Sequence, residues 1–287
     1  MDDIHALNAF LSSLKTEKAK SSYNSLVRDF KEKCNKSCFD ITAQDARKYF
    51  DMQVKKIEDG KLKLTTVNTR KAMLRSFYQY IITNEYLSGE NPIDLVEIPQ
   101  ISAYINPSKV PSIQEIDDIL EKAKNDKLVY TAIALIVKCG LPAGVICSLK
   151  ENCLVQDANN CYGLSFKYRR NIKFIKVPDN VVQIMNIYRK SKATENEYFF
   201  CNQKGKQLTL RVLEKRYRQI FTDNQKDSYT LQDIRNASIT YMLKNGAPST
   251  MVARDTITDV ERVFRYDKVI EEFQLGACDY INIKILS

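Results

Sequence analysis

The sequence predicts a mainly α-helical protein of two domains, with a small β-hairpin or sheet inserted in the second. Three observations support this fold class. Apolar residues recur at helical spacing through most of the chain. A proline-containing segment of low periodicity, Pro99–Pro111, separates two such regions. Two segments rich in β-branched and aromatic residues, Tyr162–Phe166 and Ile172–Val177, flank a short polar turn, as the strands of a hairpin do.

Length, composition and charge indicate a folded protein with a polyanionic partner. The length of 287 residues fits two ordinary domains, and a hydrophobic fraction of 44% is enough for packed cores. The net charge of +9 and the pI near 9.0 indicate a polyanionic partner. Residues 1–100 contain 16 Lys/Arg and 14 Asp/Glu, so most of the positive charge lies in residues 101–287.

The cysteine and histidine content restricts the chemistry further. The eight cysteines show no framework spacing, so we expect reduced thiols in a cytoplasmic protein. His5 is the only histidine, which argues against histidine-based catalysis; we expect no metal site and no cofactor. The chain begins without a signal segment, and its apolar stretches are too short to span a bilayer, so we expect no membrane partner.

The first hundred residues predict four helices, each with one apolar face. Thr42 and Asp45 form a capping box before the third helix, and Thr65 or Thr66 opens the fourth. Asn91-Pro92 closes the unit. We therefore predict a first domain over residues 1–98, a linker over 99–111 and a second domain over 112–287. The apolar faces are formed by Ile4, Leu7, Phe10, Leu11 and Leu14; Tyr23, Leu26, Val27 and Phe30; Ala46, Tyr49, Phe50, Val54 and Ile57; and Leu74, Phe77, Tyr78, Ile81 and Ile82.

The second domain begins with a capping box, Ser112 with Glu115, that opens a helix. An apolar helix, Tyr130–Lys138, leads through a Gly-Leu corner into a helix that starts at Pro142. The predicted hairpin turn is Lys167–Asn171. Further helices are expected at about Val181–Lys190, Leu210–Phe221, Leu231–Lys244, Ser249–Arg254 and Asp259–Phe273.

The predicted hairpin is strongly basic. No acidic residue occurs between Phe166 and Val177, and a protruding basic turn is suited to follow a phosphate backbone. The alternative is an ordinary charged hairpin in solvent. The basic residues are Lys167, Arg169, Arg170, Lys173 and Lys176.

The helix Leu210–Phe221 places Arg211, Lys215 and Arg218 on one face, at spacing i, i+4 and i+7. Glu214 is the only acidic residue of this helix. We interpret the face as a contact for the DNA backbone, although an exposed helix face has the same pattern.

Four segments resemble the tyrosine recombinase (phage integrase) family. Cys139–Lys150, CGLPAGVICSLK, resembles the family's corner T-G-L-R-x-x-E-[IL]-x-x-L, with matches at Gly140, Leu141, Ile146 and Leu149. Thr230–Arg235, TLQDIR, resembles its H-x-L-R box. Val260–Tyr266 resembles its closing stretch L-G-H-x-x-[IV]-x-x-T-x-x-Y. The residues Leu74, Phe77, Tyr78, Tyr80 and Asn91-Pro92 resemble the end of its core-binding domain.

This resemblance implies a helical, SAM-like core-binding domain and an α+β catalytic-type domain that grip duplex DNA as a clamp. It places Tyr266 at the nucleophile position and Arg235 at a phosphate-binding position. A hairpin lysine, Lys167 first and Lys173 second, takes the position that protonates the leaving oxygen. The apolar tail Phe273–Leu286 would bind a second copy or a partner recombinase, or fold back on its own domain.

The sequence departs from the family at three polar catalytic positions. Pro142 stands where the family has a phosphate-binding arginine, and Gln232 and Ile257 stand where it has histidines. No arginine occurs between Arg75 and Arg169. Proline and isoleucine supply no charge or donor, and glutamine cannot transfer a proton as histidine does. We therefore expect too little positive charge around the scissile phosphate and impaired strand cleavage.

Three hypotheses follow. The first is a DNA-binding pseudoenzyme of this family that acts in recombination or integration of a mobile element, or in its regulation. The second is an active recombinase or transposase that forms a 3′-phosphotyrosyl bond through Tyr266, with Arg169, Arg170 or Arg254 binding the phosphate. The third is a helical module whose basic faces bind acidic proteins.

Overall fold

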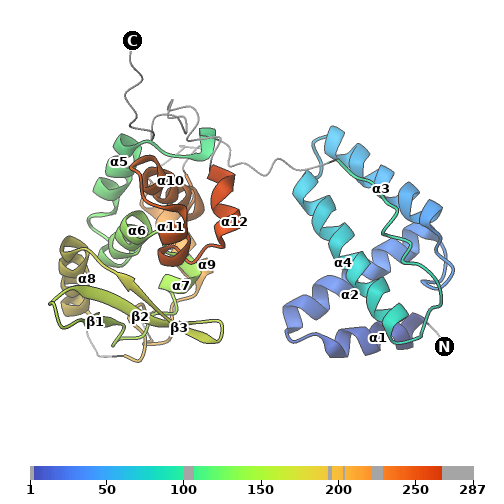
Figure 1. Ribbon diagram of the computed structural model, residues 1–287, viewed down its shortest axis with the longest axis horizontal. Helices are drawn as coiled ribbons and strands as arrows, with labels where there is room; N and C mark the ends of the chain where they lie inside the picture. The colour runs from blue at the N-terminus through green and yellow to red at the C-terminus, as the bar shows by residue number, and fades with distance from the viewer. Residues whose placement is uncertain (1–2, 100–106, 193–195, 203, 222–228, 267–287) are drawn as a thin grey trace, which may run out of the picture. The chain divides into compact units, whose positions relative to one another are not determined.

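The computed structural model describes residues 3–99, 107–192, 196–202, 204–221 and 229–266. The chain divides into two compact units, residues 1–102 and 103–287, and each has its own apolar core (Figure 1). The predicted fold class is confirmed, because helices dominate both units and the second contains a small antiparallel sheet. No helix in these ranges is long and apolar enough to cross a membrane.

Several predicted features lie outside the described residues. They are most of the linker (residues 100–106), the end of the helix expected over Asp259–Phe273, and the apolar C-terminal tail. The described part of that last helix is short. It comprises α12 (Val260–Val263) and the 3₁₀ turn η2 (Phe264–Tyr266).

The first unit consists of α1 (Asp3–Ser13), α2 (Glu17–Cys34), α3 (Ala43–Glu58) and α4 (Leu64–Thr83). The predicted capping box of Thr42 and Asp45 opens α3. Helix α4 begins one residue before the predicted Thr65 or Thr66, without a side-chain cap. Edge-to-face aromatic contacts fill the space between the helices. They join the buried rings of Phe10, Phe30, Tyr49, Phe77 and Tyr78.

The second unit is built around α6 (Lys127–Cys139), which is apolar and buried on nearly all sides. Helices α8 and α10 pack against it, with α5 and α9 at its flanks. A helix that is covered all round must be apolar all round, which explains the run of buried residues in its sequence. The surrounding elements are η1 (Pro107–Lys109), α5 (Ile113–Ala123), α7 (Ala143–Ile146), α8 (Asp179–Ser191), α9 (Leu210–Gln219), α10 (Leu231–Lys244) and α11 (Ser249–Asp255).

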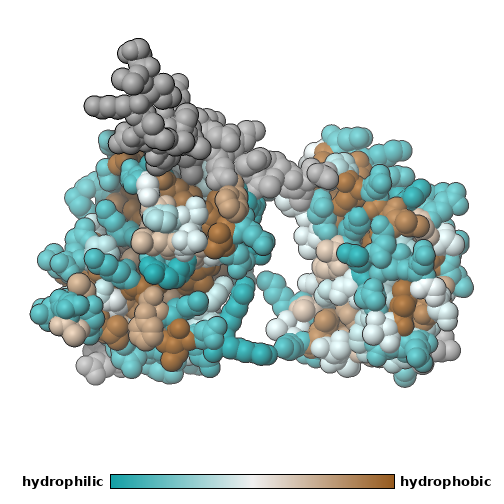
Figure 2. All heavy atoms as spheres, viewed as in Figure 1, coloured by the Kyte–Doolittle hydropathy of each residue, from teal (hydrophilic) through white to brown (hydrophobic). Residues whose placement is uncertain are grey.

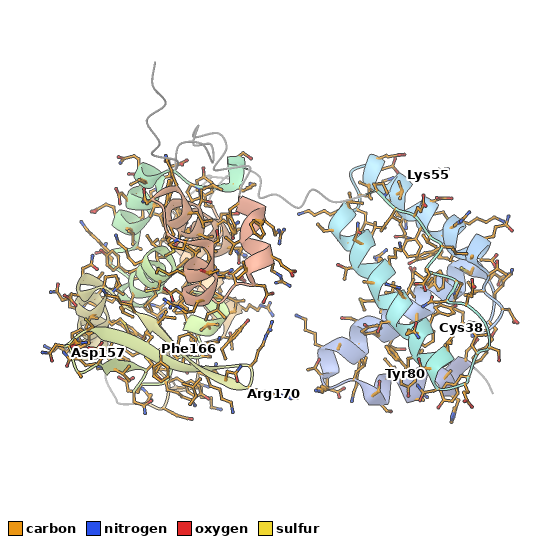
Figure 3. The ribbon with its side chains drawn as sticks, viewed as in Figure 1. Cys38, Lys55, Tyr80, Asp157, Phe166 and Arg170 are labelled. Carbon is orange, nitrogen blue, oxygen red and sulfur yellow. The ribbon has the colours of Figure 1, made fainter. Side chains whose placement is uncertain are left out.

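The sheet has three antiparallel strands in the order β1 (Leu154–Gln156), β2 (Tyr162–Tyr168) and β3 (Asn171–Lys176). The β2–β3 hairpin was predicted. Strand β2 is two residues longer than expected, and β3 begins and ends one residue earlier. Lys167 and Tyr168 pair with Ile172 and Asn171 and leave a two-residue turn, Arg169-Arg170. Strand β1 was not predicted, since three residues carry almost no periodic signal. Figure 3 shows Phe166 in the sheet and Arg170 at the end of the hairpin.

Register assigns the hairpin side chains to two faces. Leu164, Phe166 and Ile175 are buried on the inner face, and Lys173 lies on that face because it pairs with Phe166. Lys167 pairs with Ile172 on the outer face. Helix α11 packs against β3, which brings the inner face of the hairpin beside the C-terminal helices. On the face seen in Figure 2, hydrophilic side chains of both units are interrupted by hydrophobic areas.

Candidate functional site

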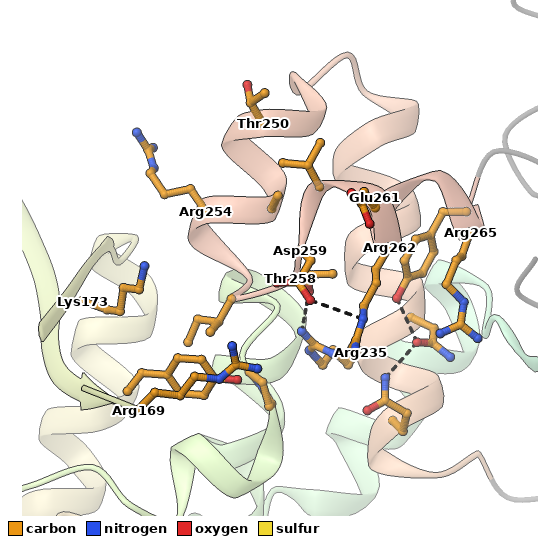
Figure 4. Close-up of a pocket in the computed structure, with 18 of the residues that line it drawn as sticks. Arg169, Lys173, Arg235, Thr250, Arg254, Thr258, Asp259, Glu261, Arg262 and Arg265 are labelled. Atoms are coloured by element: carbon orange, nitrogen blue, oxygen red, sulfur yellow. Dashed lines mark hydrogen bonds and ion pairs between the residues drawn. The ribbon is translucent and has the colours of Figure 1, made fainter. Parts of the chain in front are cut away.

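A cleft in the second unit is lined by the β2–β3 hairpin, the start of α7, α10, α11 and the α12–η2 segment (Figure 4). Its volume is about 1240 Å³. Six basic and two acidic side chains line it, so an anion inside would meet a positive field. The basic residues are Arg169, Lys173, Arg235, Arg254, Arg262 and Arg265; the acidic ones are Asp259 and Glu261.

Arg235 projects from the first turns of α10. The predicted capping box of Thr230 and Asp233 fixes the start of this helix. Arg235 Nε donates to the carbonyl oxygen of Gly140 at 2.8 Å. Its Nη2 donates to the carbonyl oxygen of Thr256 at 2.7 Å and to Thr258 Oγ1 at 2.8 Å. The guanidinium therefore joins α10 to the corner after α6 and to the turn after α11.

These contacts use Nε and Nη2 of Arg235 and leave Nη1 without a hydrogen bond to the described residues. A guanidinium has five N–H donors, of which three are used by the carbonyl and hydroxyl oxygens. Within the described residues, Nη1 donates to no protein atom. Burial lowers the pKa of Arg235, while the nearby phenols of Tyr266 and Tyr168 act in the opposite direction. The guanidinium stays cationic at neutral pH, since its ordinary pKa exceeds 12.

Gly140 makes this arrangement possible. It ends α6 in the left-handed conformation with φ 61°, where glycine carries no steric penalty. A Cβ atom at this position would lie 2.5 Å from Thr256 Cγ2. The close approach of the two backbones places the Gly140 and Thr256 carbonyl groups on the same guanidinium.

Tyr266 lies in η2 at the other side of the cleft. Its ring is 4% exposed and packs with Ile239 and Val252. Its hydroxyl donates to Asn236 Oδ1 at 3.1 Å. Burial raises the pKa of the Tyr266 phenol, and the charges of Arg235 and Arg265 only partly oppose this shift. In this conformation the phenol is neutral, hydrogen-bonded and largely covered.

Asn236 was not predicted as a site residue. Its Oδ1 accepts a second hydrogen bond, from Gln232 Nε2 at 2.9 Å, so one amide oxygen connects Gln232 and Tyr266. Asn236 is 8% exposed on a helix whose neighbouring buried residues are mainly apolar. A polar residue on a buried helix face was the available sequence signal, because such groups need a partner.

Ile257, which the resemblance places at a histidine position, lies in the turn that ends α11. Ile257 has φ 56°, a left-handed conformation that is unusual for a β-branched residue and typical of glycine at a helix end. Thr258 N donates to the carbonyl oxygen of Ala253 at 2.9 Å and closes the helix. Thr258 then directs its hydroxyl to Arg235, and Ile257 lines the cleft beside it.

Pro142 and Gln232 also line the cleft. Pro142 forms the N-cap of α7 without a side-chain hydrogen bond, and it offers the cleft no donor. The cleft as a whole is lined by more basic than acidic side chains, whereas the expected shortage of positive charge concerns the surroundings of the scissile phosphate and stays a prediction. The hairpin and α11 bring Arg169 and Arg254 to the same cleft from distant parts of the sequence.

The structure separates the hairpin cations that the sequence grouped together. Arg169 and Lys173 line the cleft, whereas Lys167 and Arg170 do not. The register explains this result for the two lysines, because Lys167 lies on the outer face of β2. Lys173 therefore lines the cleft and Lys167 does not, and the role of either lysine toward DNA stays a prediction.

The basic residues of the cleft differ in whether they form an ion pair with an acidic side chain. Arg254 pairs with the adjacent Asp255 at 2.7 Å, and Arg262 pairs with Asp259 at 3.3 Å. The guanidinium of Arg169 lies 5.4 Å from the ring centre of Tyr168. Within the described ranges, neither Arg169 nor Lys173 forms an ion pair with an acidic side chain.

The basic face on α9 lies outside the cleft. Arg211, Lys215 and Arg218 are all exposed, while Leu213 and Tyr217 on the same helix are buried. Arg216 points elsewhere and pairs with Asp126 at 2.7 Å. The three predicted cations therefore share a solvent-facing surface, as their spacing indicated.

Comparison with known proteins identifies the family. Residues 107–255, more than half of the chain, match the phage integrase family. A tyrosine recombinase of Pseudothermotoga lettingae is 30% identical over 114 residues, which cover 39% of this chain and 39% of that protein. The matched part is thus well under two thirds of this relative's length. The family match contains Pro142 and Arg235 and ends before Tyr266.

Solved structures share the fold. The Tn1549 transposon integrase in complex with transposon right end DNA has a TM-score of 0.69 at 15% identity, covering 97% of this chain and 96% of that one. A lambda integrase dimer bound to a COC′ core site has a TM-score of 0.68 at 13% identity, covering 100% of this chain and 81% of that one. This chain therefore belongs to the phage integrase family, the tyrosine recombinases.

Proposed function

We propose that this protein binds duplex DNA through the cleft of its second unit and acts in DNA recombination or integration, or in its regulation, with impaired strand cleavage. One observation carries the proposal: Arg235 lies in a cleft with five further basic side chains and only two acidic ones. Such a cleft attracts a phosphodiester backbone and gives little sequence preference by itself.

The cleft residues take roles that follow from their chemistry. Arg235 directs its remaining nitrogen, Nη1, at the scissile phosphate. Tyr266 occupies the nucleophile position, and Lys173 occupies the position of the lysine that protonates the leaving oxygen. Arg170, Lys167 and the α9 face (Arg211, Lys215 and Arg218) contact flanking phosphates. The helical first unit, residues 1–98, supplies a further DNA contact.

Impaired cleavage follows from what the cleft lacks around the phosphate. Pro142 gives no donor at the position of a family arginine, and Gln232 can donate a hydrogen bond but cannot transfer a proton. Ile257, at a histidine position by spacing, gives the cleft an apolar side chain, and the hydroxyl of the neighbouring Thr258 accepts a hydrogen bond from Arg235. A threonine hydroxyl is also no proton-transfer group at neutral pH.

The state of Tyr266 adds to this deficit. Attack requires the phenol oxygen to leave Asn236 and lose its proton, and burial disfavours the ionised form. Loss of one preorganised donor to a transition state typically costs on the order of 10²–10³-fold in rate. With several such groups missing, we propose that cleavage is slow even when DNA is bound, although the separate penalties do not add.

Duplex binding is tested by fluorescence anisotropy with a labelled duplex of about 30 base pairs over a series of salt concentrations. The expected result is binding that weakens linearly in log–log form, with a slope of about −0.9 for each phosphate contact. Absence of duplex binding at low salt would remove the proposal. A control titration with a protein of zero net charge at the same concentrations shows how much labelled DNA is lost to surfaces.

A second candidate function is active site-specific recombination. It is favoured by the presence of Lys173, Arg235 and Tyr266 in one cleft, with Arg169 and Arg254 also lining it. A duplex selected by the protein from a random library and then nicked would trap a covalent adduct. An adduct that is lost in Tyr266→Phe and kept in Tyr162→Phe would favour this candidate over impaired cleavage.

A further inference from the structure

The phosphate site around Arg235 is incomplete as a clamp. Arg235 already holds two carbonyl groups and a hydroxyl, and only Nη1 remains for a ligand. Strong phosphate binding by arginine uses two parallel N–H donors, which one nitrogen with two hydrogens satisfies poorly. Pro142, the residue at the family's second arginine position, adds no donor. Any second guanidinium must come from another part of the fold.

Arg169 is positioned to supply it. It is the first residue of the two-residue turn between β2 and β3, and it lines the same cleft as Pro142 and Arg235. In the view of Figure 4 its side chain extends from the hairpin toward Arg235. The guanidinium lies over the ring of Tyr168, which also lines the cleft. Tyr168 is close enough to Arg235 to act on its pKa, so ring and guanidinium lie in the same region.

The backbone of Arg169 is strained. Its φ of 54° is left-handed, a conformation that costs a residue with a Cβ atom and that glycine adopts freely in such turns. The neighbouring Arg170 does not have a positive φ and does not line the cleft. Strain of this kind is retained where the side chain has a task, and the turn alone gives no reason for arginine at this position.

Three other cations of the cleft fit the task less well, and a fourth, Arg265, acts on the pKa of the Tyr266 phenol. Arg254 and Arg262 are paired with Asp255 and Asp259. In Figure 4 the side chain of Arg254 extends away from Arg235. Lys173 is a single-point donor without the planar fork of arginine. Of the labelled arginines in this view, Arg169 combines direction toward Arg235 with the absence of an acidic partner in the described residues.

We propose that Arg169 binds the same phosphate group as Arg235 and replaces the guanidinium that Pro142 cannot provide. The inference rests on the proposed function, in which this cleft receives a DNA phosphate. The chemical class of the ligand is a phosphodiester monoanion, held by Arg169 on one side and by Nη1 of Arg235 on the other. Arg169 binds and orients the phosphate but transfers no proton. With Arg169 in place of the missing guanidinium, slow cleavage follows from the missing proton-transfer groups and from the buried Tyr266 phenol.

The test uses inorganic phosphate as the probe and the thermal unfolding of the second unit as the readout, at constant ionic strength. A ligand that binds only the folded protein raises Tm with its concentration. The main variant is Arg169→Gly, because glycine relieves the strain at φ 54° and is expected to keep or raise Tm without phosphate. Arg170→Ala is the matched control, since it removes an equal charge from the same turn outside the cleft. The contact that we propose for Arg170 is with a flanking phosphate of a duplex, which the inorganic phosphate probe does not supply.

The expected result separates stability from binding. Arg169→Gly unfolds at the same or a higher temperature than the wild type, yet its dissociation constant for phosphate rises on the order of tenfold or more. Arg170→Ala changes that constant less than threefold. Phosphate also stabilises proteins by exclusion from their surface, and this general effect is equal in all variants and cancels in the comparison.

A double-mutant cycle shows whether the two arginines share one phosphate. Arg235→Lys keeps the charge and avoids removing a buried cation; it should weaken phosphate binding, and Arg169→Gly should add little in that background. Equal phosphate constants in Arg169→Gly and Arg170→Ala, or strictly additive effects with Arg235→Lys, would overturn the inference. Duplex binding by the wild-type protein is measured separately. A negative result for Arg169 therefore leaves the proposed function standing, and a failure of duplex binding is recognised independently of the phosphate constants.

Discussion

The hydroxyl of Tyr266 donates a hydrogen bond to Oδ1 of Asn236 at 3.1 Å, and Tyr266 as a whole is only 4% exposed. The same amide oxygen accepts from Gln232. This relationship means that the candidate nucleophile is held by an asparagine of α10 and not by a base. The same cleft is lined by this covered phenol and by six basic side chains.

Asn236→Ala should destabilise the second unit, because it leaves the buried hydroxyl of Tyr266 without an acceptor. The expected loss is about 1–3 kcal/mol in the free energy of unfolding by urea. Tyr266→Phe removes the donor instead and leaves Asn236 bonded to Gln232, so its expected loss is smaller, about 0.5–1.5 kcal/mol. Equal costs for the two variants would contradict a buried hydrogen bond. The urea unfolding of the first unit, which contains neither substitution, serves as the internal reference.

Gly140→Ala should also destabilise the second unit. The new Cβ would meet Thr256 Cγ2 at 2.5 Å, and the residue would be held at φ 61°. We expect a loss of about 1–3 kcal/mol, combining overpacking and backbone strain. Thr256→Ser removes Cγ2 and keeps the hydroxyl, so Gly140→Ala should cost less in that background. Identical costs in both backgrounds would show that the two residues are not in contact.

Ile257→Gly should stabilise the turn after α11, since glycine adopts φ 56° without penalty. The expected gain is about 0.5–1 kcal/mol after the greater freedom of glycine in the unfolded chain is subtracted. Urea denaturation measures it, with Ile187→Gly on the exposed face of α8 as a control that should destabilise. A loss of stability in Ile257→Gly would mean that packing of the isoleucine outweighs the backbone strain.

Stability should fall at high pH in part because of Tyr266. Burial raises its folded-state pKa above the ordinary value of 10.0, so its contribution is fully present below pH 10 and is lost as the pH rises through the folded-state value. Urea midpoints measured from about pH 8 to about pH 11.5 should therefore decline less steeply in Tyr266→Phe than in the wild type. Parallel curves would show that the phenol ionises equally in the folded and unfolded protein.

The exposed cations of α9 should affect DNA binding through salt. Lys215→Ala combined with Arg218→Ala should reduce the log–log salt slope by about 0.9 for each phosphate that the protein no longer neutralises, equally for unrelated duplexes. Lys190→Ala with Lys204→Ala removes the same charge from exposed positions of the second unit to which we assign no role. A salt slope that falls as much in this control as in the α9 variant would show a general charge effect without a defined binding surface.

The sequence identified those parts of the fold that depend on local signals. The capping boxes at Thr42, Ser112 and Thr230 were all found, because each is formed by residues three apart and needs no tertiary information. The helical faces of the first unit and the β2–β3 hairpin followed from periodicity in the same way. Strand β1 was missed because three residues are too few to show a period.

The candidate site was only partly predictable, because its geometry depends on contacts between distant segments. Arg235 followed from its motif, but the three oxygens that hold it belong to Gly140, Thr256 and Thr258. The choice between Lys167 and Lys173 required strand register, which a shift of one residue reverses. Two arginines that line the cleft together with Pro142 come from the hairpin and α11, and no spacing rule relates them to the corner after α6.

The most direct test of a DNA-binding cleft with impaired cleavage is an assay for a covalent complex on a nicked duplex that the protein has selected from a random library. We predict tight, salt-dependent binding of this duplex and no covalent adduct on a denaturing gel within hours. Rapid formation of an adduct that disappears in Tyr266→Phe would contradict impaired cleavage, and failure to select or bind any duplex would contradict the DNA-binding cleft itself.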